Sequence, residues 1–364
     1  MIVGVFSPVI NWCGGAEWVA INVILALKEA GHQVIVLSDN PLDQKKFEHV
    51  FNRIVPVDRQ IIFPLRFFSS TNYHNIYTDA VRSLMLKTKC DILIDTFSNA
   101  ILPGMDASYI HYPLLKRIET KLPTMRNKIF FNPYRSCLKL RKEDVNNKLI
   151  FANSSFTAKA IKAEIGVNPH ILYPSVSNEI LNIDEHFFQQ SRKNNVVTIA
   201  RITKGKNLEV IPYISQKTNK DTTFTIVGLL DSKEILASLL KLIEDLSLSN
   251  RVKILTNVNR DQLRNILLNS KVYLHTKVNE HFGISIIEAM AAGCIPVVHD
   301  SGGPMEFVPL NQRFRNISEA AEIIERTIDN WSTMYSRQVS ESVKIFGENN
   351  FSKRFIDIFH SHFQ

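Results

Sequence analysis

Short apolar segments alternate with amphipathic segments through the second half of the chain, and this alternation restricts the fold more than any other feature. Residues 194–202, 222–228, 251–258 and 271–276 each favour a buried strand, because each is a short apolar run rich in β-branched side chains. Between them lie longer stretches whose apolar residues recur at helical spacing. A regular alternation of strands and helices predicts a parallel sheet covered by helices, which is a doubly wound α/β domain.

The first half of the chain repeats this organisation. Residues 1–9 favour a strand, residues 18–31 a helix, and residues 33–38 a second strand, which together make a βαβ unit. Further strands are predicted at residues 53–57, 91–97, 106–113 and 148–154. We therefore expect a second Rossmann-like half, with its ligands beyond the carboxyl ends of the strands.

The length of 364 residues is too great for one compact core, so we predict two facing domains with a cleft between them. The predicted ranges are an acceptor-side domain at residues 1–174, a donor-side domain at 175–345, and a C-terminal helix at 346–364 that packs back on the first domain.

Two glutamates flank a glycine-containing turn in the stretch EHFGISIIEAMAAG, which runs from Glu280 to Gly293. A helix is predicted to begin near Gly283, with Glu280 in the preceding loop and Glu288 on the second turn. Its N-terminus presents free N–H groups and the positive end of the helix dipole, so it can bind an anion. The glutamates themselves have three interpretations: the acid and nucleophile of a glycoside hydrolase, acceptors for ligand hydroxyls, or surface charge. An anion site beside carboxylates favours a ligand that is both anionic and rich in hydroxyls, such as a nucleotide-sugar.

Other candidate residues lie at the predicted carboxyl ends of strands. Arg201 and Lys206 end the first strand of the second domain, where two cations would neutralise a diphosphate, although solvated surface cations are equally common in loops. Gly14 and Gly15 open the first helix and can bring backbone N–H groups close to phosphates, or simply form a tight turn. His111 follows a predicted strand and should face the cleft, although a lone histidine can also be structural.

The segment from Leu114 to Lys148 holds ten basic and three acidic residues, and its net charge of +7 is nearly all of the +8 of the whole chain. It also contains Phe130, Phe131 and Tyr134. We predict that this segment docks the protein on an anionic membrane surface, with the aromatic side chains inserting; a solvated helical face is the alternative. Nucleic acid is not expected as a partner, because Glu280 would repel it from the anion site.

Several sequence patterns are absent. No Asp-x-Asp occurs, so we expect sugar transfer without a metal or other cofactor, and neither a P-loop nor a dinucleotide-binding glycine pattern follows a strand. No apolar run reaches the roughly 20 residues that span a bilayer. The first residues favour a strand and not a signal peptide, and the four cysteines show no metal-ligand spacing. We therefore expect a cytoplasmic protein that is peripheral on the cytosolic face of a membrane.

These residues resemble the motifs of a known family. Glu280 and Glu288 match the E-x7-E motif, and Arg201 and Lys206 the Arg-x4-Lys pair, of the retaining glycosyltransferases of family 4, which have the GT-B fold. More narrowly, the stretches CGGAE, YIHYP, FANSSFT, NEHFGISIIEAMAAG and HDSGGP resemble the dolichol-pathway α-1,2-mannosyltransferases that extend the lipid-linked N-glycan precursor. The given sequence is shorter than those enzymes, and we expect it to differ from them in having no N-terminal membrane helix. The resemblance implies transfer of a sugar, with GDP-mannose as the donor, to a hydroxyl of a glycan or lipid-linked acceptor.

The resemblance also implies roles for the residues of the second domain. Arg201 and Lys206 would stabilise the departing diphosphate, Glu280 would hold the donor sugar, and Glu288 would hold the ribose hydroxyls. Backbone N–H groups would contact the sugar and phosphate at Phe282, Gly283 and Ile284.

In the first domain, the resemblance implies that Gly14 and Gly15 give the diphosphate room. His111 would contact the donor sugar or position the acceptor hydroxyl, and so joins Arg201, Lys206 and Glu280 as a catalytic candidate. Three alternatives stay open: a glycosyltransferase that uses UDP-glucose or another UDP-sugar, a GT-B epimerase that needs no acceptor, and a non-catalytic subunit that binds nucleotide-sugars.

Overall fold

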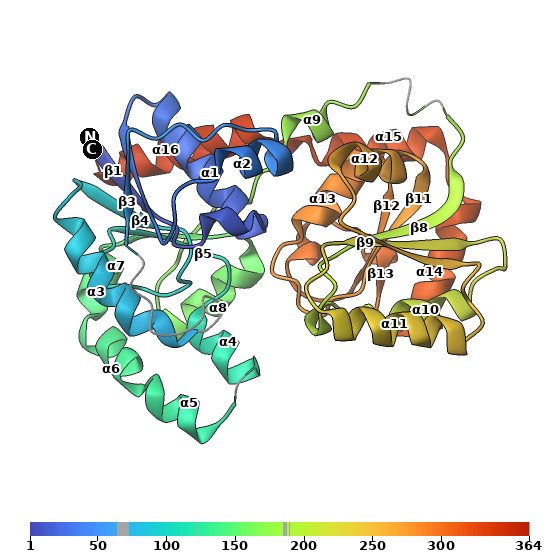
Figure 1. Ribbon diagram of the computed structural model, residues 1–364, viewed down its shortest axis with the longest axis horizontal. Helices are drawn as coiled ribbons and strands as arrows, with labels where there is room; N and C mark the ends of the chain where they lie inside the picture. Colours follow the sequence, from blue (N-terminus) through green and yellow to red (C-terminus); the bar gives the residue numbers. More distant parts are fainter. Residues whose placement is uncertain (64–72, 122, 185–187, 189, 364) are drawn as a thin grey trace. The chain divides into compact units, whose positions relative to one another are not determined.

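Two compact units make up the chain, each built on one parallel sheet (Figure 1). The first unit comprises Met1–Ser175 and Glu348–Gln364, and the second comprises Val176–Gly347. The computed structural model describes residues 1–63, 73–121, 123–184, 188 and 190–363, without the side chains of Lys121 and Lys142. The predicted architecture of two doubly wound α/β halves is confirmed.

The sheet of the first unit has, in the part of the chain that the structure describes, seven strands in the order β3-β2-β1-β4-β5-β6-β7. Every neighbouring pair runs parallel. The strands are β1 (Ile2–Phe6), β2 (Gln33–Ser38), β3 (Arg59–Ile62), β4 (Ile92–Asp95), β5 (Ala107–Ile110), β6 (Leu149–Ala152) and β7 (His170–Ile171). The helices between and after them are α1 (Gly15–Glu29), α2 (Gln44–Phe51), α3 (Ile76–Lys87), α4 (Leu114–Lys121), α5 (Met125–Phe130), α6 (Asn132–Leu140), α7 (Lys142–Asn146), α8 (Ser155–Ile165) and α16 (Glu348–Phe363).

The sheet of the second unit has six strands among the described residues, in the order β10-β9-β8-β11-β12-β13, again all parallel. The strands are β8 (Lys193–Ile199), β9 (Thr223–Gly228), β10 (Val252–Thr256), β11 (Ser270–His275), β12 (Ile295–His299) and β13 (Arg313–Phe314). The helices are α9 (Asn178–Leu181), α10 (Val210–Gln216), α11 (Lys233–Asp245), α12 (Arg260–Leu268), α13 (Ile284–Ala291), α14 (Ile317–Asp329) and α15 (Thr333–Ser342).

One predicted strand is wrong. Residues 53–57 form a loop, and the edge strand β3 begins only at Arg59. Pro56 has no N–H to donate to a sheet. The backbone of Val55 is already used, because its N–H and its carbonyl bond the side chain of Gln44 at 3.0 and 2.9 Å. The segment is therefore tied to α2 and not to a neighbouring strand.

The C-terminal helix α16 belongs to the first unit, where it packs against α1. Phe351, Phe355 and Phe359 are buried on one face of α16, as their spacing of four residues along a helix requires. Glu348 accepts a hydrogen bond from Arg53 at 3.0 Å, which ties the start of α16 to the loop after α2. The chain thus returns to its first unit after completing the second.

The parallel strands of each sheet end at a shared edge, and the loops at these edges carry the candidate residues. In the first unit, Gly14 and His111 follow β1 and β5. In the second unit, Arg201 and Lys206 follow β8, and Glu280 follows β11. Crevices at this edge are where doubly wound sheets bind ligands.

Candidate functional site

The N-terminus of α13 is a half-buried end of backbone N–H groups at the sheet edge. Gly283 stands before the first helical residue with φ of 100°, a left-handed conformation that favours glycine. Its carbonyl accepts from Ile286 at 2.9 Å and Ile287 at 3.4 Å. The N–H groups of Ile284 and Ser285 therefore have no intrahelical acceptor. These two N–H groups lie where the anion site is predicted.

Glu280, in the loop before α13, is the centre of an ion-pair cluster. Its Oε1 lies 2.9 Å from Lys277 Nζ and also accepts the N–H of His281 at 2.9 Å. Its Oε2 lies 3.2 Å from Lys206 Nζ and 3.2 Å from His275 Nε2. Burial alone would raise the pKa of Glu280, but Lys206, His275 and Lys277 outweigh burial and hold it well below the usual value. Glu280 is therefore a carboxylate near neutral pH.

His275 is the last residue of β11, and its neutral ring hydrogen-bonds to Glu280. Burial lowers the pKa of His275, although Glu280 opposes the shift. A carboxylate can only accept, so Nε2 carries the hydrogen and Nδ1 is an acceptor. Tyr273 Oη lies 3.4 Å from that Nδ1 and 2.8 Å from Ser285 Oγ on the first turn of α13. A hydrogen-bonded chain thus connects Glu280 to the helix end.

Of the four predicted charged residues in the second unit, the structure brings Lys206 and Glu280 into contact. Lys206 ends the 3₁₀ turn Lys204–Lys206, and Thr276 Oγ1 donates to its carbonyl at 2.8 Å, which fixes the turn against the loop after β11. Arg201 is instead 61% exposed at its side chain and lies 3.6 Å from Asp231. A single ion pair at that exposure stabilises little, so Arg201 can turn toward a ligand.

Glu288 lies on the second turn of α13, as predicted, and is half-buried. Burial raises the pKa of Glu288 to about 7, and the nearby Arg260 opposes this shift. Glu288 is thus partly protonated near neutral pH, whereas Glu280 is not. The environments of the two glutamates of the motif thus shift the carboxyl pKa in opposite directions.

The candidates in the first unit occupy two loops. Gly14 caps α1, and its N–H already donates to Glu17 Oε2 at 2.8 Å, so the next N–H groups, from Gly15 onward, are the ones at the helix end. His111 is half-buried after β5, and its Nε2 lies 3.2 Å from the carbonyl of Thr96. Burial lowers the pKa of His111 to about 4, so the ring is neutral, with Nε2 as the donor and Nδ1 as an acceptor.

The basic segment from Leu114 to Lys148 forms the four short helices α4 to α7. The prediction that its aromatic side chains insert into a membrane is wrong for Phe131 and Tyr134. Both are buried in the core of the first unit, and Tyr134 Oη accepts the N–H of Ile101 at 2.9 Å. Among the described residues of this segment, the large apolar side chains that are exposed are Met125, Ile129 and Leu140.

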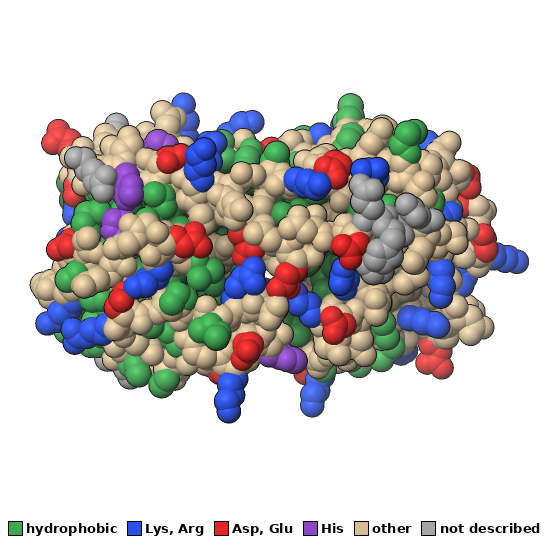
Figure 2. All heavy atoms as spheres, turned by 90° about the horizontal axis from the view of Figure 1, so that it is seen from above, with side chains coloured by type: hydrophobic (Ala, Val, Ile, Leu, Met, Phe, Trp, Pro, Cys, Tyr) green, Lys and Arg blue, Asp and Glu red, His purple; other side chains and the backbone are tan. Residues whose placement is uncertain are grey.

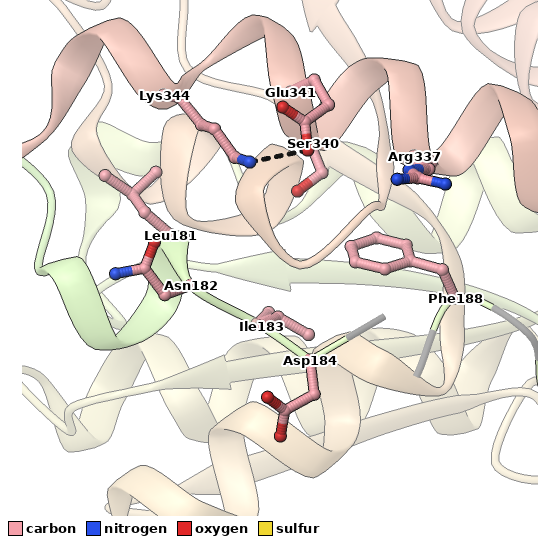
Figure 3. A pocket seen from close by; sticks show the side chains of 9 residues that line it. All are labelled: Leu181, Asn182, Ile183, Asp184, Phe188, Arg337, Ser340, Glu341 and Lys344. Carbon is pink, nitrogen blue, oxygen red and sulfur yellow. Dashed lines mark ion pairs between the residues drawn. The ribbon is translucent and has the colours of Figure 1, made fainter. Parts of the chain in front are cut away.

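A separate cavity of about 300 Å³ lies in the second unit between α9, residues 182–184, Phe188 and the end of α15 (Figure 3). Arg337, Ser340, Glu341 and Lys344 line one side of it, and Lys344 pairs with Glu341 at 2.7 Å. None of the predicted site residues lines this cavity.

Most of the second unit matches the model of a known protein family. The model of the glycosyl transferases group 1 family matches residues 181–350. The matched residues are therefore similar to the glycosyl transferases group 1. The matched residues include Lys206, Glu280 and the N-terminus of α13, where the anion site is predicted.

Curated relatives extend the similarity over most of the chain. The chain is 25% identical over 292 residues to the GDP-Man:Man(3)GlcNAc(2)-PP-Dol alpha-1,2-mannosyltransferase of Dictyostelium discoideum, an alignment that covers 69% of this chain and spans 58% of that relative. It is 26% identical over 356 residues to the alpha-1,3/1,6-mannosyltransferase ALG2 of the same organism, covering 81% of each chain. The prediction that the chain is a glycosyltransferase enzyme is confirmed.

A solved glycosyltransferase from Rickettsia africae superposes with a TM-score of 0.75 at 16% identity, over 100% of this chain and 98% of that chain. This likeness concerns the fold alone, and it confirms the predicted GT-B architecture of the glycosyltransferase. In the part of the chain that the structure describes, no helix combines the length and hydropathy needed to cross a bilayer. No group of three or more potential metal ligands occurs among those same residues.

Proposed function

We propose that this glycosyltransferase moves mannose from GDP-mannose to a hydroxyl of a lipid-linked oligosaccharide, with retention and without a metal ion. The observation that carries the proposal is the contact of Lys206 with Glu280 beside the N-terminus of α13. It places a cation for a diphosphate, backbone donors for phosphate oxygens and a carboxylate for sugar hydroxyls within one loop region. Mannose and the lipid-linked acceptor follow from the names of the relatives.

In the proposed reaction, the bond between the anomeric carbon and the phosphate oxygen breaks as the acceptor oxygen bonds the same face of that carbon. The departing phosphate oxygen takes the acceptor's proton, so no general acid is needed. Lys206, Arg201 and the end of α13 stabilise the charge that grows on the diphosphate. His111, neutral and with a free acceptor at Nδ1, would orient a sugar or acceptor hydroxyl.

The charge state and the contacts of Glu280 argue against a role for this residue as either the acid or the nucleophile of a glycoside hydrolase. A residue with a pKa well below the usual value cannot serve as a general acid. As a nucleophile it would be weak, because four donors already surround its two oxygens. Hydrogen bonding to a ligand is the role that suits this carboxylate, and Glu288 would accept from the ribose hydroxyls.

The relatives differ in the linkage they form but share a mannosyl transfer in their names, with comparable identity to this chain. An α-1,3/1,6 linkage is therefore a second candidate beside α-1,2. The decisive assay incubates the purified protein with radiolabelled GDP-mannose and each of a series of lipid-linked oligosaccharides, with UDP-glucose in parallel. We expect incorporation from GDP-mannose that survives EDTA.

Three outcomes of this assay contradict the proposal. Incorporation from UDP-glucose alone would reassign the donor, and conversion of the donor sugar without any acceptor would indicate an epimerase. Loss of activity in EDTA that Mg²⁺ or Mn²⁺ restores would show that a metal carries the diphosphate charge.

We further propose that α5 and α6 hold the glycosyltransferase on an anionic lipid surface, where a lipid-linked acceptor would lie. Met125 and Ile129 are 70% and 67% exposed one turn apart on α5, and Leu140 is 86% exposed at the end of α6. Exposed cations adjoin them at Arg126, Lys128 and Lys139. On the face of the molecule that Figure 2 shows, Lys and Arg side chains are dispersed among Asp and Glu.

Reversing the charge of Arg126, Lys128 and Lys139 to glutamate should release the protein from anionic vesicles. Each cation near such a surface is worth about 1 kcal/mol, so three reversals should abolish sedimentation with phosphatidylserine vesicles at low salt. Transfer to a lipid-linked acceptor should slow, whereas the affinity for GDP should stay unchanged. A control reverses Lys217, Lys220 and Lys241 in the second unit. Equal sedimentation of both triple variants would contradict the proposed surface.

A further inference from the structure

The carboxylate of Glu280 is saturated before any ligand arrives. Its two oxygens receive Lys277 and the His281 N–H on one side, and Lys206 and His275 on the other, all between 2.9 and 3.2 Å. A carboxylate offers about four lone-pair positions to donors. A sugar hydroxyl can therefore hydrogen-bond to Glu280 only when one of these four donors leaves.

Lys206 and Lys277 are the two donors with flexible stems, with side chains 21% and 20% exposed, and of these Lys206 is the one that the proposed function sets against a diphosphate. The His281 N–H is fixed by the backbone, and His275 is anchored by Tyr273 and lies at the buried end of β11. Under the proposed function Lys206 is also the group that a diphosphate attracts, so the same cation has two anionic partners that compete for it.

We propose that Glu280 pairs with Lys206 while the site is empty, in the place that the donor diphosphate takes when it binds. Donor binding thus moves Lys206 from Glu280 to the diphosphate. This inference rests on the proposed nucleotide-sugar site. The diphosphate takes Lys206 from Glu280, and the lone pair that this frees on Oε2 accepts a hydroxyl of the donor sugar. After transfer, Glu280 recaptures Lys206 and competes with the product diphosphate, which favours its release.

Lys277 would keep Glu280 paired with a cation after Lys206 has left. The sequence motif assigns no role to Lys277. It holds Oε1 at 2.9 Å, opposite the oxygen that Lys206 leaves. With His275 it keeps Glu280 charged and in place while Lys206 points to the diphosphate. Lys277 is thus a positioning residue, which acts through Glu280 and does not touch the donor.

The test measures the affinity for GDP by calorimetry in a mutant cycle of Lys206 and Glu280. Glu280→Gln removes the competing charge, so it should tighten GDP binding by roughly tenfold, as expected for contacting charged residues. In a Lys206→Met background the same substitution should change GDP affinity little, because the competition has already ended. The preference for GDP-mannose over GDP should fall in Glu280→Gln in either background.

A general effect of removing one negative charge would tighten GDP binding equally in both backgrounds, and that result would overturn the exchange. Unchanged or weaker GDP binding by Glu280→Gln would also overturn it. Glu280→Asp keeps the charge but shortens its reach to Lys206, and should give a smaller gain of the same sign if Glu280→Gln fails to fold. Absence of GDP binding by the unmodified protein would refute the proposed donor and the exchange together, whereas binding without the gain refutes the exchange alone.

A second cycle tests the role of Lys277. Lys277→Met should weaken GDP binding in the unmodified protein, because Glu280 then depends more on Lys206. In the Glu280→Gln background the same substitution should have no effect on GDP affinity. An equal loss in both backgrounds would mean that Lys277 contacts the diphosphate directly, which would contradict its role as a positioning residue.

Discussion

Lys206→Met is expected to lower kcat by roughly 100- to 1000-fold, the usual loss when one electrostatic stabiliser of a transition state is removed. Negative charge accumulates on the diphosphate as the sugar departs, so a cation there stabilises the transition state more than the bound donor. KM should change less than kcat, because removing Lys206 also removes its competition with the donor for Glu280. Initial rates at saturating acceptor, over a range of donor concentrations, separate the two constants.

Lys204→Met is the matched control for this substitution. Lys204 is an exposed cation of the same 3₁₀ turn, two residues away, and its loss changes the net charge equally. We expect its kcat to stay within about twofold of the unmodified enzyme, as for a surface substitution. Similar values of kcat for the two variants would remove Lys206 from the chemical step and leave it a residue of donor binding or structure.

The positions of the charged motif residues followed from local patterns in the sequence. The alternation of strands and helices predicted both sheets, and parallel strands end at one edge, so Arg201, Lys206 and Glu280 could be assigned to that edge in advance. The helix boundaries near Gly283 and Gly293 also followed from the two glycines, which adopt φ of 100° and 80°.

The partners of Glu280 did not follow from the sequence. Lys206 and Glu280 are separated by 74 residues, and their contact depends on the pairing of β8 with β11. Lys277 lies in an irregular loop, where no periodicity indicates the direction of a side chain. His275 had a weak signal, because it is a polar residue at the end of an otherwise apolar strand, where candidate ligand residues are expected.

The aromatic residues of the basic segment show how composition can mislead. Phe131 and Tyr134 are three residues apart and so lie on one face of the helical segment, which is the spacing of a core-facing pair. The high charge of their neighbours suggested a surface, but the cations occupy the other faces of the short helices α5 and α6. Met125 and Ile129, four residues apart, form the exposed apolar pair that the charge pattern alone did not indicate.

Gly302→Ala is expected to reduce kcat/KM by at least about 100-fold, because Gly302 packs closely against the backbone of Glu280. Gly302 follows β12 with φ of 81°, and the N–H of Gly303 donates to the Glu280 carbonyl at 2.8 Å. A Cβ at Gly302 would lie 2.2 Å from the carbonyl oxygen of Glu280 and 2.8 Å from its nitrogen. Neither atom can rotate away as a side chain can, so the loop that carries Glu280 must move, and a shift of about 1 Å at a catalytic group costs about 100-fold in rate.

Gly166→Ala separates this displacement from the strain of the backbone conformation itself. Gly166 ends α8 with a φ of 86°, close to the 81° of Gly302, but its ψ is 6° where that of Gly302 is −160°, and a Cβ there would meet no atom within 4 Å. Gly166→Ala should lose about 1–2 kcal/mol of stability from the left-handed conformation. Gly302→Ala should lose more, because its backbone lies in a region that essentially only glycine adopts. Thermal unfolding measures both losses. Only Gly302→Ala should also lose activity per folded molecule, because only there does the added methyl group act on the backbone of Glu280. If the two variants retain equal kcat/KM after correction for the folded fraction, the placement of Glu280 does not limit the reaction, and its role as a sugar ligand fails with it.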